Sequence, residues 1–364
     1  MHYKLGFVME QTLGHVAHAQ NFRHWVAKDP EVTPTWIQIP FAASDRWGRM
    51  PMVKHNWTVL ASLRAREQLQ AALRTERLDG LFLHTQVLGL FAHRLMKKIP
   101  TVVSMDATPL NFDSIGTPYN HTPSAYKPVE AFKNALNRRL FKHARKLISW
   151  NEWAKQSLLR DYGVTANKVA VIPPGIDLDR WHVRREASRS GPVRLLFVGG
   201  DFQRKGGEFL MTAFRQELSR HCTLDIVTHE DVNTGGLPNV RVHKRLAPNS
   251  GELIALYASA DVLVLPTLGD SLPMVIMEAM AAGLPVVATS VGAIAEQVEH
   301  GVTGFLVPVA DHRSLAETIL RLVDNPDLRR QMGEAARCAA RRLFSGEQNY
   351  RDVLTICKNC VDAG

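Results

Sequence analysis

The chain has 364 residues, which predicts two domains at about 150 residues each. Apolar residues make up 45% of the chain and charged residues 22%, and this composition excludes a disordered chain, a collagen-like repeat and a multi-span membrane protein. The formal net charge is +9, and residues 1–175 hold all of the excess, with 23 Lys and Arg against 12 Asp and Glu. This asymmetry predicts an anionic partner for the first half: a membrane surface, an acidic substrate or a nucleic acid.

In the first half, short apolar runs alternate with longer amphipathic stretches, the pattern of a parallel sheet with crossover helices. The predicted strands are residues 4–9, 35–39, 80–83, 101–105, 146–150 and 169–172, and the longest predicted helices are 59–77 and 128–144. Pro173-Pro174-Gly175 then breaks the chain, and a polar, basic stretch follows over 184–192. We therefore expect an N-terminal domain over residues 1–175.

A second alternation begins after this break. It predicts strands at 194–198, 223–227, 240–243, 262–265 and 286–288, with helices at 207–218, 250–259 and 272–282. The last stretch is helical and Arg-rich, with a break near Ser345-Gly346. The pattern predicts two consecutive Rossmann-like halves, the second over 176–345, followed by a C-terminal helix over 346–364.

Neither the N-terminus nor the most apolar window predicts membrane targeting. The apolar stretch within MHYKLGFVMEQTLGH is too short for a secretory leader. The window Val275–Ala295 contains Glu278, Gly283 and Pro285, which favour a helix, a turn and a buried strand over a membrane span. We expect a cytoplasmic protein.

Two loops of the second half carry groups suited to ligand binding, because open parallel sheets bind ligands where strands end and helices begin. The loop Gly199–Gly207 follows a predicted strand. Its glycines would let backbone N–H groups approach a phosphate, and Arg204 and Lys205 could neutralise a diphosphate. The alternative is a flexible surface turn with solvated charges.

The second loop places one carboxylate, Asp270, after strand 262–265 and another, Glu278, about two turns inside the following helix. Ionised carboxylates accept hydrogen bonds from sugar diols. The alternative roles are a helix cap for Asp270 and a solvated position for Glu278. Because the helix around Glu278 is almost wholly apolar, this carboxylate needs a partner, which could be a ligand.

The stretch from Asp270 to Ala288, DSLPMVIMEAMAAGLPVVA, resembles the nucleotide-sugar signature of glycosyltransferase family 4. The resemblance continues through VGAIAE at 291–296, GVTGFLV at 301–307, VIPPGID at 171–177 and Lys205-Gly206. It covers most of residues 169–310, whereas the first half is similar mainly in its strand rhythm.

The resemblance implies a GT-B fold, in which two Rossmann-like domains present parallel sheets across a cleft that holds the donor. It further implies a retaining sugar transfer from a nucleotide-diphosphate sugar, UDP rather than GDP, to a hydroxyl acceptor: a glycan, a lipid or a small-molecule aglycone. The family usually needs no metal ion, so we expect no cofactor. The acceptor would lie mostly on the N-terminal domain, and the C-terminal helix would cross back to that domain.

Carried over position by position, the resemblance implies that Asp270 holds sugar hydroxyls and Glu278 the ribose, while Arg204 and Lys205 stabilise the departing diphosphate. Asp106 would support the anomeric centre or orient the acceptor. The implied catalytic residues are Asp106, Arg204, Lys205 and Asp270. The implied donor-binding residues are Gly14, His15, Gly199, Gly200, Arg204, Lys205, Arg245, Asp270, Ser271, Leu272, Pro273, Met274 and Glu278.

Three positions depart from the family pattern: Asp270 replaces a glutamate, Gly200 an arginine and Asp106 a histidine. The last two leave room for an inactive, donor-binding partner subunit. A nucleotide-sugar 2-epimerase of similar fold is the other alternative. We expect no nucleic-acid binding, because no recognised motif accompanies the basic half.

Two further candidates carry an ordinary structural alternative. His84 follows a predicted strand and could reach the acceptor or the cleft, or it could be a satisfied structural histidine. Cys357 and Cys360 form a single CxxC without the second ligand pair of a zinc site, so we expect no metal there.

Residues 127–147 combine seven cations, opposed only by Glu130, with apolar residues at near-helical spacing. These are Phe132, Leu136, Leu140, Phe141 and Leu147. Either the apolar stripe packs on the N-terminal sheet and the cations are solvated, or the surface docks peripherally on anionic lipid.

Overall fold

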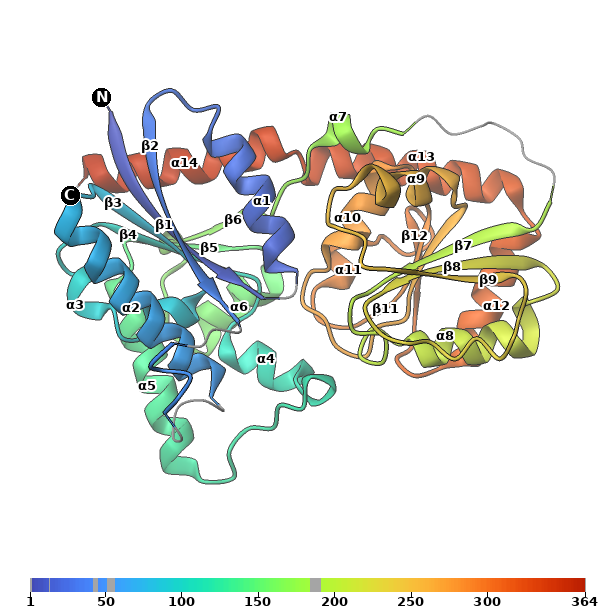
Figure 1. Cartoon of the computed structure of the whole chain (residues 1–364), viewed down its shortest axis with the longest axis horizontal. Helices are drawn as coiled ribbons and strands as arrows, with labels where there is room; N and C mark the ends of the chain where they lie inside the picture. Colours follow the sequence, from blue (N-terminus) through green and yellow to red (C-terminus); the bar gives the residue numbers. More distant parts are fainter. Residues whose placement is uncertain (1, 13, 42–44, 51–55, 184–190, 364) are drawn as a thin grey trace. The chain divides into compact units, whose positions relative to one another are not determined.

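The computed structural model describes residues 2–12, 14–41, 45–50, 56–183 and 191–363, and it divides into two compact units (Figure 1). Unit 1 comprises Met1–Phe112, Thr122–Gly175 and Gly346–Gly364, and unit 2 comprises Asp113–His121 and Ile176–Ser345. The segment Asp113–His121 thus packs with unit 2, although the sequence analysis placed it in the first domain. Residues 184–190 of the basic stretch lie outside the described residues.

Unit 1 contains a six-stranded parallel sheet of order β2-β1-β3-β4-β5-β6. Each of the six predicted apolar runs is a strand, because strands buried on both faces are apolar almost throughout. The strands are β1 Tyr3–Gln11, β2 Val32–Pro40, β3 Gly80–His84, β4 Thr101–Met105, β5 Lys146–Ser149 and β6 Val169–Val171.

Helices cover both faces of this sheet (Figure 1). They are α1 His15–Val26, α2 Trp57–Thr75, α3 His93–Met96, α5 Lys127–His143, α6 Glu152–Arg160 and α14 Gly346–Asp362, while α4, Pro109–Ile115, leads into the segment that belongs to unit 2. Successive strand residues point to opposite faces, so Phe7 packs with α1 and α14 whereas Val8 packs with α2 and α5. The core therefore has two layers, one on each side of β1.

Unit 2 repeats the architecture with strand order β12-β11-β10-β7-β8-β9. The strands are β7 Val193–Val198, β8 Cys222–Thr228, β9 Val240–Lys244, β10 Val262–Leu265, β11 Val286–Thr289 and β12 Gly304–Val307. β12 was not predicted from the sequence, because its apolar run is short and begins with glycine, a residue depleted in strands. Glycine is required there, since a Cβ on Gly304 would lie 2.0 Å from the Val286 carbonyl oxygen.

The helices of unit 2 are α7 Leu178–Trp181, α8 Gly207–Ala213, α9 Gly251–Ser259, α10 Met274–Ala281, α11 Ile294–Gln297, α12 His312–Val323 and α13 Pro326–Leu343. The helix predicted over 207–218 ends at Ala213, and Phe214–Leu218 continues it as a π-helical turn. α8 packs against α12, and α10 packs against α13 (Figure 1). No helix formed by the described residues has the length and apolar character needed to cross a bilayer.

In each sheet the strand order reverses beside the first strand. β1 lies between β2 and β3, and β7 lies between β8 and β10. Ligands of open parallel sheets bind outside the carboxyl ends of the strands at such a point. The loops after β1 and β3 in unit 1, and after β7 and β10 in unit 2, are therefore the places to look for function.

Candidate functional site

The loops after β7 and β10 touch through their backbones. Gly206 has a φ of +77°, and a Cβ on it would lie 1.8 Å from the Pro266 carbonyl oxygen. Only glycine allows both this conformation and this approach. Leu268 N–H also donates to the Arg204 carbonyl at 2.9 Å. Gly206 thus allows the two loops to come into contact.

Lys205 and Asp270 form an ion pair at the switch point of the sheet. The Lys205 ammonium donates to the Asp270 carboxylate, and the two side chains are 13% and 12% exposed. Burial lowers the pKa of Lys205, and the Asp270 carboxylate partly offsets this effect. The pair sets a cation and a hydrogen-bond acceptor at the ends of adjacent strands. Both residues were predicted from the sequence to bind the donor, but the ion pair between them was not predicted.

The turn after β11 holds Asp270 in place. Gly292 has a φ of +57°, and a Cβ on it would lie 2.1 Å from the Asp270 carbonyl oxygen. Ala293 N–H donates to the Ser271 carbonyl at 2.9 Å. The close backbone approach therefore requires glycine at position 292, in the stretch 291–296 where the family resemblance continues.

Arg204 is 5% exposed and ties several loop groups together. Its Nε donates to Asp201 Oδ2 at 3.0 Å, and its Nη1 donates to the Gly269 carbonyl at 3.0 Å and to the Tyr119 hydroxyl at 3.2 Å. The guanidinium also lies 4.3 Å from the centre of the Tyr119 ring. Tyr119, which sequence reasoning missed, comes from the segment 113–121 of unit 2. Arg204 thus positions the loop that carries Lys205.

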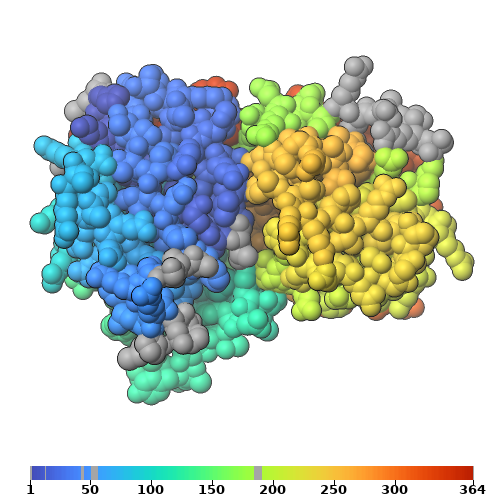
Figure 2. Space-filling view, viewed as in Figure 1, coloured from blue at the N-terminus to red at the C-terminus, as the bar shows by residue number. Residues whose placement is uncertain are grey.

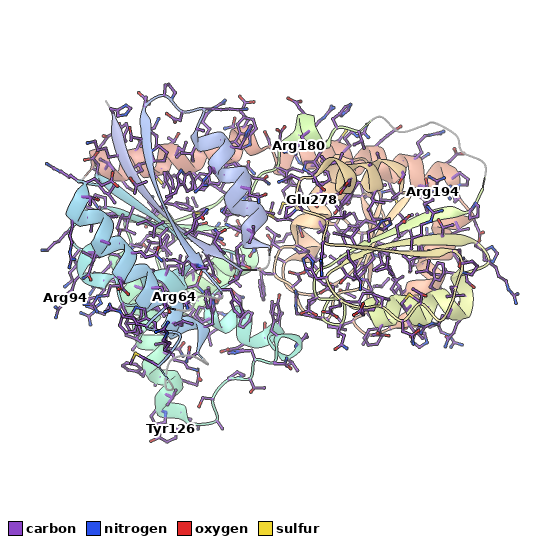
Figure 3. The ribbon with its side chains drawn as sticks, viewed as in Figure 1. Arg64, Arg94, Tyr126, Arg180, Arg194 and Glu278 are labelled. Carbon is purple, nitrogen blue, oxygen red and sulfur yellow. The ribbon has the colours of Figure 1, made fainter. Side chains whose placement is uncertain are left out.

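Glu278 lies on α10 and is 4% exposed (Figure 3). Its Oε2 accepts a hydrogen bond of 2.9 Å from the Tyr257 hydroxyl, whose ring packs edge-on against Trp181. Burial raises the pKa of Glu278 to about 7, although the Tyr257 hydrogen bond opposes the shift. The partner that this carboxylate needed is therefore a protein group on α9. Oε1 accepts no hydrogen bond from the described residues, so it can serve a ligand.

The other residues of unit 2 that were predicted to bind the sugar donor lie at several different places around the sheet. Ser271, Leu272 and Met274 are buried at the start of α10, where Pro273 provides no side-chain cap for the first amides. Gly199 N–H donates to the Val227 carbonyl, and the Gly200 carbonyl accepts from the Thr228 hydroxyl. Arg245 is exposed after β9, the edge strand two places from β7.

In unit 1, His15 and His84 meet at the switch point of the sheet, where His15 Nδ1 lies 2.8 Å from His84 Nε2. His84 is fully buried, and its ring stacks on Trp150 with centroids 5.0 Å apart. Burial, with the neighbouring His18 and His15, holds the pKa of His84 well below its usual range. Of the two alternatives that the sequence left open for His84, complete burial favours the structural one, in which its Nε2 contacts His15.

The pairing assigns a tautomer to both rings. His84 Nδ1 is buried without a partner among the described residues. A buried N–H group without an acceptor is rarer than a buried acceptor without a donor. We therefore place the His84 proton on Nε2, which donates to His15 Nδ1. His15 then carries its own proton on Nε2, as a donor.

A third histidine completes this cluster. His18 Nδ1 lies 3.1 Å from the Tyr350 hydroxyl, which donates to the Gly175 carbonyl at 3.0 Å. Burial, and secondarily His15, lowers the pKa of His18 to about 3. His18 and His84 are therefore neutral near pH 7.

Gly14 and Asp106 lie at the ends of the same sheet. Gly14 precedes α1 with an ordinary φ of −65°, and a Cβ on it would meet nothing within 4 Å. Asp106 follows β4, is half-buried, and its carbonyl accepts from Asn151 Nδ2 at 2.8 Å.

The apolar stripe predicted over 127–147 mostly packs on the sheet of unit 1. Leu140, Phe141 and Leu147 belong to its core, and Leu136 packs against them. Phe132 alone of the five is exposed, at 64%. Tyr126, just before α5, is 65% exposed (Figure 3). Most of the apolar stripe therefore packs on the sheet of unit 1, as the first of the two alternatives predicted.

Cys357 and Cys360 lie on the face of α14 that packs on the sheet. Burial raises the pKa of both thiols, which disfavours the reactive thiolate. Within the described part of the chain, no group of three or more His, Cys, Asp or Glu side chains is arranged to hold a metal ion.

Two models of glycosyltransferase families match most of the chain. Residues 18–180 match the family model for Glycosyltransferase Family 4, and residues 192–325 match the model for glycosyl transferases group 1. The D-inositol 3-phosphate glycosyltransferase of Pseudarthrobacter chlorophenolicus is 29% identical over 233 residues, which cover 58% of this chain and 56% of that protein. The chain thus spans just over half the length of the curated relatives it matches.

Two solved structures resemble the whole chain. Sucrose-phosphate synthase from Thermosynechococcus elongatus has a TM-score of 0.79 at 17% identity, covering 100% of both chains. Anabaena HepE, solved with UDP and glucose, has a TM-score of 0.71 at 16% identity, covering 98% of this chain and 99% of that one. At such identities the likeness shows the fold alone, and it confirms the expected GT-B fold.

Proposed function

The chain belongs to glycosyltransferase family 4, and from this premise we propose that it transfers a sugar from a nucleotide-diphosphate sugar to a hydroxyl acceptor. The observation that carries the proposal is the Lys205–Asp270 pair, set where β7 and β10 end. The largely buried ammonium of Lys205 suits a diphosphate, and the adjacent carboxylate suits sugar hydroxyls.

In this proposal the Lys205 ammonium and the first amides of α10 stabilise charge on the departing diphosphate. Asp270 orients the sugar, and Glu278 Oε1 accepts from the ribose diol. The bond from the anomeric carbon to the diphosphate breaks while the acceptor oxygen bonds on the same face, and the acceptor proton passes to the leaving oxygen. The configuration is then retained, and the protein cations supply the charge that a metal ion would otherwise supply.

Unit 1 would serve the acceptor, with His15 as an N–H donor positioned by His84, and with Asp106 at the end of β4. UDP is the nucleotide we propose, supported by the fold likeness to HepE, which was solved with UDP. The protein would act in the cytoplasm.

Peripheral contact with anionic membrane through residues 127–147 is supported by the exposed Phe132 and by the exposed Arg138, Arg139 and Lys142. Figure 2 shows this stretch, in turquoise, at the surface of unit 1. Cosedimentation with anionic vesicles at low salt tests the contact, with Arg138, Arg139 and Lys142 replaced by Ser. A wild type that stays in the supernatant excludes it.

The activity is tested by incubating the protein with UDP- and GDP-sugars and a panel of acceptors, and by measuring nucleoside diphosphate release and the anomeric configuration of the product. We expect acceptor-dependent release and a retained configuration. An altered nucleotide sugar without release would favour the epimerase, and donor binding without any turnover would favour an inactive partner subunit.

A further inference from the structure

An open hollow of about 590 Å³ lies at the amino-terminal edge of the sheet in unit 1. Lys146 begins β5 there, and Lys168 immediately precedes β6. His15 and His84, in contrast, lie at carboxyl ends of strands in the same sheet. Because all strands of this sheet are parallel, the hollow is at the edge opposite the histidine pair. It is therefore separate from the candidate site of unit 1.

The hollow is lined by five cations, Lys97, Lys142, Arg145, Lys146 and Lys168, together with His143. No Asp or Glu lines it, and none of the five cations forms an ion pair with a described carboxylate. Lys168 is partly buried, and this burial lowers its pKa. Burial and the surrounding cations likewise lower the pKa of His143.

Two of these ammonium groups are held in position by the backbone. Lys168 Nζ donates to the Lys142 carbonyl at 2.8 Å, and Lys146 Nζ donates to the Asn167 carbonyl at 2.6 Å. Each bond uses one of the three N–H donors of an ammonium and leaves two for a ligand. Lys146 and Lys168 are thus held in place despite the repulsion of the neighbouring cations.

We propose that this hollow is a binding site for a phosphate-bearing anion. A concave surface of one sign concentrates its potential, and an anion would relieve the repulsion among the five cations. Lys and Arg side chains donate hydrogen bonds to phosphate oxygens. A bound anion would also stabilise the protonated form of His143, the histidine that lines the hollow. The site does not depend on the sugar transfer proposed above.

The phosphate can come from a lipid headgroup or from a soluble ligand. The outer face of α5 leads toward the hollow through Arg139 and Lys142, and the exposed Phe132 lies on the same helix. This continuity favours a headgroup, so the experiment has one arm for each source.

The test compares the wild type with two double variants that remove the same charge from exposed positions. Lys142→Ala with Arg145→Ala alters the hollow, whereas Arg74→Ala with Arg77→Ala alters basic residues that do not line it. One arm titrates inorganic pyrophosphate by calorimetry. The other measures cosedimentation with phosphatidylcholine vesicles, with and without phosphatidylglycerol, at low and high salt.

We expect the hollow variant to bind at least about tenfold more weakly than the wild type and the control variant. Loss in the vesicle arm identifies a headgroup. Loss in the pyrophosphate arm alone identifies a soluble ligand, and the site then stands although the membrane contact fails. Equal binding by both variants, or no binding in either arm, overturns the site, and neither result bears on nucleoside diphosphate release.

Discussion

At the point where its strand order reverses, unit 1 holds two imidazole rings and unit 2 holds an ammonium paired with a carboxylate. In unit 1, His84 is buried and stacks on Trp150, while the half-buried His15 contacts it and can offer a ligand one N–H donor. The groups of unit 2 are charged and held by loops whose backbones touch at Gly206 and Gly292. In the proposed function, the same architecture therefore serves the acceptor hydroxyl in unit 1 and the diphosphate and sugar hydroxyls of the donor in unit 2.

We expect the stabilities of the two units to respond to pH in opposite directions, although burial is the leading cause of the pKa shift in both. Burial disfavours the charged form of any group. It therefore lowers the pKa of His18 in unit 1 and raises the pKa of Glu278 in unit 2. Acid should therefore destabilise unit 1 by protonating His18, and base should destabilise unit 2 by ionising Glu278.

The largest expected effect is the acid sensitivity of unit 1. The unfolded chain protonates His18 below about 6.5, whereas the folded unit does so only near 3. Stability is therefore lost as pH falls through this window, by up to about 5 kcal/mol. His18→Phe keeps a ring in place and should remove this loss. Hydrogen exchange of unit 1 peptides at pH 7 and pH 4 measures it.

The exposed His24 on the same helix provides the control. His24→Phe should keep the acid profile of the wild type. An identical acid profile for His18→Phe would show that His18 does not control the acid stability of unit 1.

The second effect concerns turnover. Lys205→Ala removes a preorganised cation from the diphosphate site and should lower turnover at least about a hundredfold, or about 2.7–4 kcal/mol in the barrier. Lys244→Ala breaks an exposed ion pair with Asp231 in the same unit and should leave turnover unchanged. Release of nucleoside diphosphate measures both. Equal turnover in the two variants rules out a role for Lys205 in catalysis.

Sequence reasoning predicted every strand except β12 and identified polar residues in the loops that follow several strands, because apolar runs and strand-end loops are local patterns. It did not predict the pairs that these residues form. Tyr257 is 21 positions from Glu278, and Tyr350 is 332 positions from His18. No periodicity relates such distant positions, so only the fold brings them together. The same limit explains why the segment with Tyr119 was assigned to the wrong unit.

The third effect tests Glu278. Its folded pKa of about 7 lies above the unfolded value of 4.5, so the wild type loses stability as pH rises through this window, by about 3 kcal/mol. Glu278→Gln still accepts from Tyr257 and cannot ionise. We expect it to match the wild type near pH 4 and to be more stable at pH 8, as measured by urea unfolding.

The same variant should bind the donor more weakly, by about 1.5–3 kcal/mol, because a charged acceptor of the ribose diol is lost. A variant that is more stable at pH 8 but binds UDP-sugar with unchanged affinity would place Glu278 outside the donor site. Reduced stability at pH 8 would contradict the raised pKa instead.

The smallest expected effect is a difference in stability among variants at three loop glycines, two in unit 2 and one in unit 1. Gly206 and Gly301 share a left-handed φ, of +77° and +81°, but only at Gly206 would a Cβ strike another loop. Gly301→Ala should cost about 1–2 kcal/mol for the conformation. Gly206→Ala should cost about 1–3 kcal/mol more, because the Pro266 carbonyl must shift. In unit 1, Gly14→Ala should stay within about 1 kcal/mol of the wild type, since its φ is ordinary and the space open.

Urea midpoints of the three glycine variants measure these differences, and turnover shows whether they reach the site. The shift at Gly206 should displace Lys205 and lower turnover, whereas Gly301→Ala should unfold more easily yet keep its activity. Equal stability of the Gly206 and Gly301 variants would mean that the loops after β7 and β10 can separate without cost. The Lys205–Asp270 pair would then depend on its own attraction rather than on the backbone contact, and the contrast between a built site in unit 2 and an open loop in unit 1 would be lost.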